Sequence, residues 1–141
     1  MKFRSGIQKG QNPRPDVKVG KRADLGGQFF RSRSEANYAR YLNLLKTQGR
    51  ILGWEYEPHT FQFEAIKRGT RDYTPDFKVY LTNGTHEWHE VKGWMDAKSK
   101  TRLNRMEKYF PDEKVVVIGP KWFSQARRNG LAASLQHWES A

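Results

Sequence analysis

The chain has 141 residues, no cysteine and a formal net charge of +11 at pH 7. This length suits about one domain that can bury its own core, and the absence of cysteine excludes disulfides, thiolate nucleophiles and cysteine-bound zinc. The positive charge favours a polyanionic partner, and nucleic acid fits better than an acidic membrane because no amphipathic helix with a clean basic face is visible.

No run of apolar residues approaches the length of a membrane span, and the N-terminus has no hydrophobic signal core. We therefore expect a cytoplasmic protein with no membrane partner.

The first 33 residues differ in composition from the rest of the chain. They contain nine Lys or Arg residues and two acids, which is +7 of the total +11, and aliphatic residues are scarce. Such a segment cannot bury enough apolar surface to offset its ordering entropy. We predict a flexible basic arm at 1–33, with a solubilising tail as the alternative, and a folded domain at 34–141.

The segment 34–49 has the pattern of an amphipathic helix. Ser34 can cap the first turn, Ser32 with Glu35 three residues later also fits a capping box, and Gly49 suits the left-handed exit. Inward-facing residues recur at spacings of four and three: Tyr38, Leu42 and Leu45. Glu35 lies on the same inward-facing stripe. A favourable interaction with the helix dipole would explain an acid in the first turn, but it would not explain why this acid faces inward.

Short alternating segments follow this helix. They predict strands at 51–58 and 59–66, a turn with a basic tip at Lys67 and Arg68, and a further strand at 73–81.

The dipeptide Asn83-Gly84 predicts a tight hairpin that folds 85–93 antiparallel onto the preceding strand. Pro75 cannot donate to a central ladder, so we expect the start of that strand to lie at an edge or a bulge.

The two strands of this hairpin carry charged residues on one face. Asp76 points away from the apolar face that Phe77 and Val79 form, and Glu90 and Lys92 share one face because strand side chains alternate. An exposed ion pair on a solvated edge strand is the simple interpretation of Glu90 and Lys92.

The rest of the chain predicts a helix at 97–110 capped by Asp96, a buried strand at 114–119 parallel to a neighbour, and short helices within 121–139. One basic stripe runs along the helix at 97–110: Lys98, Arg102 and Arg105. The order of elements indicates an α/β (α+β mixed) fold with a mixed central β-sheet flanked by helices.

Three acids from distant parts of the chain are expected to converge on this sheet: Glu35, Asp76 and Glu90. Carboxylate oxygens favour one or two Mg²⁺ (or Mn²⁺) ions over zinc, and the carbonyl of Val91 is a further candidate ligand. Such an ion suits phosphodiester hydrolysis, with Lys92 contacting the attacking water or the phosphate as a point charge. A zinc site at His86 and His89 is disfavoured because these side chains alternate to opposite faces.

The stretches 74-TPDF-77 and 90-EVKG-93 resemble the signature of the PD-(D/E)XK nuclease superfamily. The helix stretch 34-SEANYARYL-42 resembles the additional acidic helix of many members. The longer run from 73-YTPDF-77 to 90-EVKGWMDAKSKTRL-103 resembles phage endonuclease I of the T-seven type, a Holliday-junction resolvase, and the extra strands at 51–66 suggest related small phage nucleases.

This resemblance implies a restriction-endonuclease-like core and a Mg²⁺-dependent endodeoxyribonuclease. It implies a catalytic set of four residues: Glu35, Asp76, Glu90 and Lys92. It also implies branched DNA as a substrate, a homodimer if junctions are resolved, and a bacterial host cell if the protein is phage-encoded. The expected DNA-binding residues are Arg31, Arg33, Lys67, Arg68, Trp94, Lys98, Arg102 and Arg105.

Three alternatives stay open at this point. The protein can be a nuclease without structural selectivity for duplex or single strands, a nucleic-acid-binding module without catalysis on the same fold, or a basic interaction protein. A binding module has no reason to hold three acids near phosphates, which favours an enzyme.

Overall fold

The computed structural model describes residues 18–140. The strands are β1 (Gly20–Arg22), β2 (Gln28–Phe30), β3 (Ile51–Tyr56), β4 (Phe61–Gln62), β5 (Asp72–Tyr73), β6 (Phe77–Leu81), β7 (His86–Val91) and β8 (Val115–Ile118). The helices are η1 (Ala23–Leu25, a 3₁₀ turn), α1 (Arg33–Thr47), α2 (Ala97–Tyr109), α3 (Pro120–Arg128) and α4 (Leu131–Ser134). None of the helices in this range is both long enough and apolar enough to cross a bilayer.

A four-stranded mixed sheet forms the centre of the molecule, in the order β3-β6-β7-β8. The first two pairings are antiparallel, and β7 pairs with β8 in parallel. The predicted hairpin between β6 and β7 is confirmed: Gly84 takes a left-handed conformation with φ of 89°, and the Asn83 side chain accepts a hydrogen bond of 3.0 Å from the Thr85 amide.

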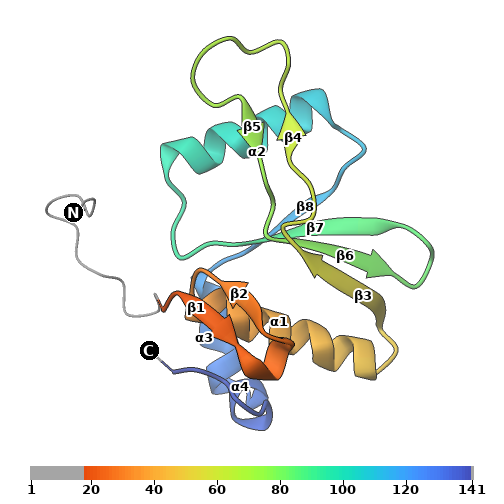
Figure 1. The fold of residues 1–141 in the computed structure, drawn as a ribbon, viewed down its shortest axis with the longest axis vertical. Helices are drawn as coiled ribbons and strands as arrows, with labels where there is room; N and C mark the ends of the chain where they lie inside the picture. Colours follow the sequence, from red (N-terminus) through yellow and green to blue (C-terminus); the bar gives the residue numbers. More distant parts are fainter. Residues whose placement is uncertain (1–17, 141) are drawn as a thin grey trace, which may run out of the picture.

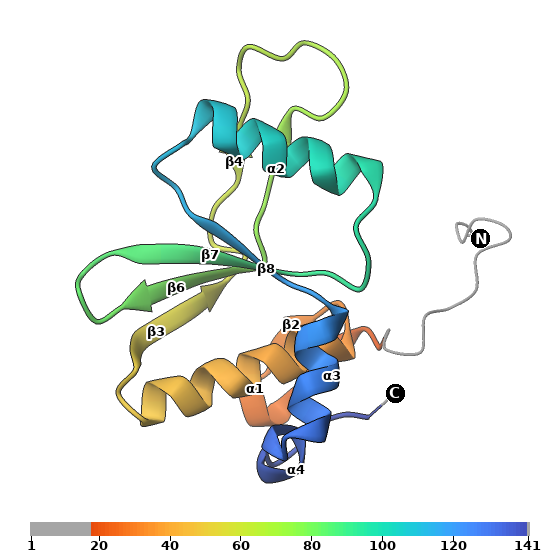
Figure 2. The same cartoon turned by 180° about the vertical axis from the view of Figure 1, so that it is seen from behind.

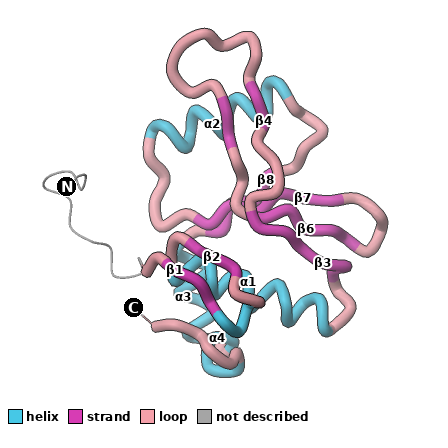
Figure 3. The backbone as a smooth tube through the Cα atoms, viewed as in Figure 1, coloured by secondary structure: helices cyan, strands magenta, loops and turns pink. Residues whose placement is uncertain are grey.

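Two layers cover the two faces of this sheet (Figures 1 and 2). The larger layer contains α1, α3, α4 and the β1–β2 hairpin, and it packs on a core that includes Phe77 and Val79. The other layer contains α2 and the β4–β5 ribbon, visible as a separate pair of strands in Figure 3, and it encloses a second core around Phe63, Trp88 and Met106. The predicted mixed α+β fold with flanking helices is confirmed.

Residues 20–33 belong to the folded unit, so the prediction of a flexible arm extending to residue 33 is wrong for this part. Phe30 is fully buried, and its ring centroid lies 4.6 Å from that of Tyr56 and 6.3 Å from that of Phe77. The hairpin is stabilised by core contacts with residues far along the chain, which local composition does not reveal. Residues 1–17 of the predicted arm lie outside the described residues.

Element boundaries differ from the predicted ones at three places. Helix α1 begins at Arg33, and Ser32, one of the two predicted caps, caps it: the Ser32 Oγ accepts a hydrogen bond of 3.0 Å from the Glu35 amide. The predicted strand at 59–66 is reduced to β4. The predicted strand at 73–81 is divided into β5 and β6 because Pro75, which is fully buried, lacks an amide donor for the ladder.

A buried arginine on α1 joins both ends of the described chain to the larger layer. Arg40 donates to both carboxylate oxygens of Asp24 at 2.8 and 2.9 Å and to Glu139 at 3.0 Å. Glu139 also accepts a hydrogen bond of 2.7 Å from the Arg22 Nε in β1. The network therefore fastens the N-terminal hairpin and the C-terminal segment to α1.

We predict that Arg40→Met lowers the free energy of unfolding by about 2–3 kcal/mol, because it leaves Asp24 without its ion-pair partner and removes one of the two arginines that bind Glu139. The value is smaller than for a fully buried ion pair because both acids are partly exposed and Glu139 keeps its contact with Arg22. Chemical denaturation measures the change. Arg128→Met, at an exposed position of α3, is the matched control and should stay within about 0.5 kcal/mol of the native protein. Equal losses in the two variants would contradict the role of the network.

Candidate active site

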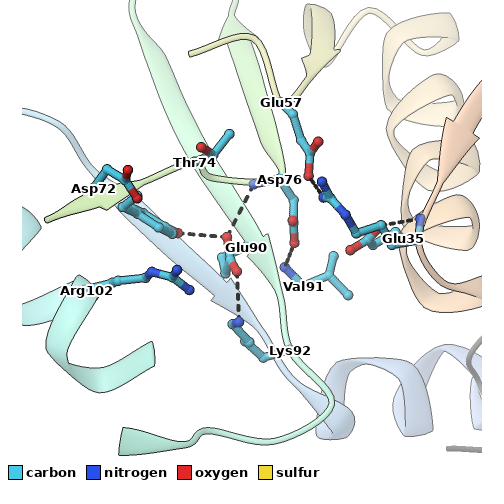
Figure 4. A pocket seen from close by; sticks show the side chains of 11 residues that line it. Glu35, Glu57, Asp72, Thr74, Asp76, Glu90, Val91, Lys92 and Arg102 are labelled. Atoms are coloured by element: carbon cyan, nitrogen blue, oxygen red, sulfur yellow. Dashed lines mark hydrogen bonds and ion pairs between the residues drawn. The ribbon is translucent and has the colours of Figure 1, made fainter. Parts of the chain in front are cut away.

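Asp76 and Glu90 face each other across the ends of β6 and β7. Phe77 pairs with His89, and continuing this register by one residue places Asp76 opposite Glu90 on the same face of the sheet. The Asp76 Oδ2 accepts a hydrogen bond of 2.8 Å from the Val91 amide, and the Glu90 Oε1 accepts one of 3.3 Å from the Asp76 amide. Each carboxylate is therefore held by an amide of the opposite strand (Figure 4).

Lys92 extends the same face beyond the end of β7. Its amide donates to the Ile118 carbonyl at 2.9 Å, so the parallel pairing with β8 fixes the backbone here. Its Nζ lies 3.1 Å from the Glu90 Oε2. The Glu90 Oε1 also accepts a hydrogen bond of 2.8 Å from the buried Tyr73 hydroxyl. Three donors thus engage the Glu90 carboxylate: Tyr73, Lys92 and the Asp76 amide.

Glu35 reaches the site from the other layer of the molecule. It lies in the first turn of α1, and its Oε1 accepts hydrogen bonds of 2.7 Å from the Tyr56 hydroxyl and 3.0 Å from the Arg31 amide. Figure 4 shows it on the side of Asp76 away from Glu90.

Burial raises the pKa of two of the three acids. The pKa of Asp76 lies well above its ordinary value, first because the carboxyl is buried and then because Glu90 and Glu35 add negative charge nearby. Burial also raises the pKa of Glu35, against the hydrogen bond from Tyr56 that stabilises its charged form. The pKa of the Tyr73 hydroxyl is raised by burial and by Glu90, so this phenol remains protonated as a donor.

The arrangement fits a divalent cation on two carboxylates. Among residues 18–140, no three Asp, Glu or His side chains form a group that could hold a metal ion, so the expected convergence of all three acids on one ion is not present in the structure. The reason is that Glu35 belongs to the other layer and is engaged by Tyr56 and Arg31. Mg²⁺ is commonly held by one or two carboxylates and several waters, a requirement that Asp76 and Glu90 can meet.

Two cavities adjoin these residues. The first, of about 470 Å³, is lined by the acids together with Tyr73 and Arg102. The second, of about 240 Å³, is lined in part by Ser32, Trp94 and Asp96. Both cavities share four lining residues: Arg31, Glu35, Val91 and Lys92. They therefore form neighbouring parts of one concave surface, with Glu35 and Lys92 between them.

The predicted DNA-binding residues divide into two groups. Three of them line the cavities: Arg31, Arg102 and Trp94, whose side chain is 55% exposed. The others line neither of these two cavities. Lys67 and Arg68 are exposed in the β4–β5 loop and Lys98 is exposed on α2, whereas Arg105 donates to the Thr70 carbonyl and Arg33 is half-buried at the start of α1.

Sequence reasoning missed the tyrosines that hold the acids. Tyr73 and Tyr56 each donate to a carboxylate, and Asp72, which is not among the predicted site residues, lines the first cavity. The position of Tyr73, three residues before Asp76 in the stretch 73-YTPDF-77, is the sequence feature from which its contact with the site could have been predicted. Tyr56 carries no comparable signal, because only the packing of β3 against α1 brings it to Glu35.

We predict that Asp76→Asn stabilises the metal-free protein at neutral pH by about 1–3 kcal/mol, the size typical of an uncompensated buried polar group. Because the folded state raises the Asp76 pKa, its favourable contribution is complete below the ordinary Asp pKa and is lost as pH rises through the raised value. The variant removes this loss and keeps an acceptor for the Val91 amide. Thermal denaturation from acid to neutral pH measures the difference.

The exposed Asp112→Asn is the matched control and should show no such pH dependence. Mg²⁺ at neutral pH should stabilise the native protein and not Asp76→Asn. A variant less stable than the native protein at neutral pH would contradict the electrostatic account of Asp76.

Comparison with known families gives one match, over residues 18–125, to a family described as "Protein of unknown function (DUF1064)". No curated protein matches the chain. The matched range contains the central sheet, α1, α2 and every residue that lines the two cavities. Because the match spans well over half of the sequence, the protein belongs to the DUF1064 family.

Proposed function

We propose that the protein is a metal-dependent endonuclease that hydrolyses phosphodiester bonds in DNA, and that it is a member of the PD-(D/E)XK superfamily with a restriction-endonuclease-like core. The observation that carries the proposal is the pair of buried carboxylates, Asp76 and Glu90, held reciprocally across two strands with Lys92 beside them. This group borders a cavity in a chain of net charge +11.

In the proposed hydrolysis, different side chains bind the metal ion and contact the phosphate. Asp76 and Glu90, with the carbonyl of Val91 as a further candidate, would hold Mg²⁺ or Mn²⁺. When bound, such an ion lowers the pKa of a water molecule and offsets the negative charge that builds on the phosphate. Lys92 contributes a positive charge beside Glu90, where it can contact a phosphate oxygen or orient the attacking water. Glu35 lines both cavities and borders the same reaction space.

The acids favour an enzyme over a binding module. A phosphate backbone approaching Asp76, Glu90 and Glu35 would meet buried negative charge, which weakens binding unless a cation compensates it. A protein that only binds DNA needs the basic residues but not this cluster.

For the substrate we propose branched DNA, such as a Holliday junction, processed in the cytoplasm of a bacterial host by a homodimer. This part depends on the resemblance of 73-YTPDF-77 and 90-EVKG-93 to phage junction resolvases. A nuclease acting on plain duplex or single strands with the same acids is the second candidate, since the geometry of the acids supports phosphodiester hydrolysis equally for every shape of DNA.

We predict that the native protein cleaves DNA with Mg²⁺ or Mn²⁺ and not with EDTA. Supercoiled plasmid, a linear duplex and a four-way junction are incubated separately, and the rates are compared together with the mass of the protein in solution. Faster cleavage of the junction by a dimer supports structural selectivity. Equal rates on the junction and the linear duplex favour the second candidate, and no cleavage of any substrate with either metal refutes the enzyme.

We predict that Asp76→Asn lowers the cleavage rate at least about 10³-fold while DNA binding is kept or tightened, because the change removes a metal ligand and a negative charge. Lys92→Met should lower the rate at saturating protein by about 10²–10³-fold with a small effect on affinity. Asp112→Asn is the control for charge and should cleave at the native rate. Native activity in Asp76→Asn would show that the catalytic site lies elsewhere.

A further inference from the structure

Arg102 has an unusual environment beside the acids. Its Nε is the single buried side-chain nitrogen or oxygen in the described part of the chain that has no hydrogen-bond partner. The side chain projects from α2 into the first cavity, toward Glu90 (Figure 4). A buried donor without a partner is unfavourable, and an arginine cannot relieve this by losing its proton.

The neighbouring acids do not neutralise Arg102. Glu90 is already engaged by Tyr73, Lys92 and the Asp76 amide, and Asp72, which lines the same cavity, forms no ion pair with the guanidinium. The Arg102 Nε has no hydrogen-bond partner, and no acid among residues 18–140 forms an ion pair with the guanidinium, so its charge is available to an anion that enters the cavity.

The other basic residues of α2 behave differently. Arg105 donates to the Thr70 carbonyl, and Lys98 and Lys100 are exposed to solvent. Only one member of the predicted basic stripe, Arg102, therefore borders the cavity that contains Asp76, Glu90 and Lys92.

We infer that Arg102 binds the phosphate at which cleavage occurs, as a second cationic contact beside Lys92. This inference rests on the proposed nuclease function and specifies which of the basic residues touches the reacting group. A phosphodiester presents two non-bridging oxygens, and the planar guanidinium can donate to both in a fork that an ammonium cannot reproduce. Arg102 and Lys92 would then approach the phosphate from α2 and from the residue that follows β7, within the cavity that Glu90 also lines.

The first test observes the Arg102 Nε–H directly by ¹⁵N NMR of the full chain, with its signal identified by its loss in Arg102→Lys. A short DNA duplex is titrated in EDTA and again in Ca²⁺. We expect the signal to shift saturably in at least one condition. If other signals report DNA binding while that of Arg102 stays unchanged in both conditions, the inference is overturned.

The second test measures cleavage in a single turnover at saturating protein. Arg102→Met should lower the rate by about 10²–10³-fold with little change in Kd, because the contact strengthens as charge builds on the phosphate. Arg102→Lys should recover part of the rate. Lys100→Met removes the same charge from an exposed position of α2 and should cleave at the native rate. A native rate in Arg102→Met, or equal losses in Arg102→Met and Lys100→Met, refutes the inference.

The two tests separate this inference from the proposed function. A shifted Arg102 signal without any cleavage would support the phosphate contact and refute the nuclease. Cleavage with an unmoved Arg102 signal would support the nuclease and refute the contact.

Discussion

The backbone amides of Asp76 and Val91, at the end of the β6–β7 pair, determine the geometry of the site. Like charges placed directly opposite each other on adjacent strands repel, yet Asp76 and Glu90 occupy such a pair because each carboxylate accepts a hydrogen bond from an amide of the other strand. The arrangement requires the register that the turn at Asn83-Gly84 sets, since a slip of one residue in either strand would place Asp76 and Glu90 on opposite faces of the sheet.

The site contains an unfavourable interaction, the repulsion between buried acids, in a fold whose other interactions are favourable. Burial and the neighbouring negative charges raise the pKa of Asp76 and of Glu35, and the hydrogen bond from Tyr56 only partly offsets this at Glu35. Folds retain conflicts of this kind mainly at functional positions. In the proposed reaction, a divalent cation would offset the negative charge of the acids, and the phosphate of the substrate would offset the positive charge of Arg102.

The two layers bring their residues to the same end of the sheet. The larger layer packs on Phe77 and Val79 and thereby fixes α1, whose first turn carries Glu35. The smaller layer encloses Trp88 and Met106 and thereby fixes β5 and α2, which carry Tyr73 and Arg102. The cores of the two faces thus position groups that lie more than sixty residues apart in the chain around one cavity.

The sequence by itself determined the features that depend on local chemistry: the helix beginning near Ser32, the hairpin at Asn83-Gly84 and the shared face of Glu90 and Lys92, because caps, turns and strand alternation act over a few residues. Tertiary structure decided the rest. Residues 20–30 fold onto the domain because Phe30 packs in the core and because Arg22 forms an ion pair with Glu139, 117 positions away in the sequence. Likewise, the sequence does not distinguish the members of the basic stripe on α2. The packing of that helix against the β4–β5 ribbon places Arg102 at the cavity with the acids, whereas Arg105 donates to the Thr70 carbonyl. Long-range contacts of this kind join residues whose pairing no local pattern encodes.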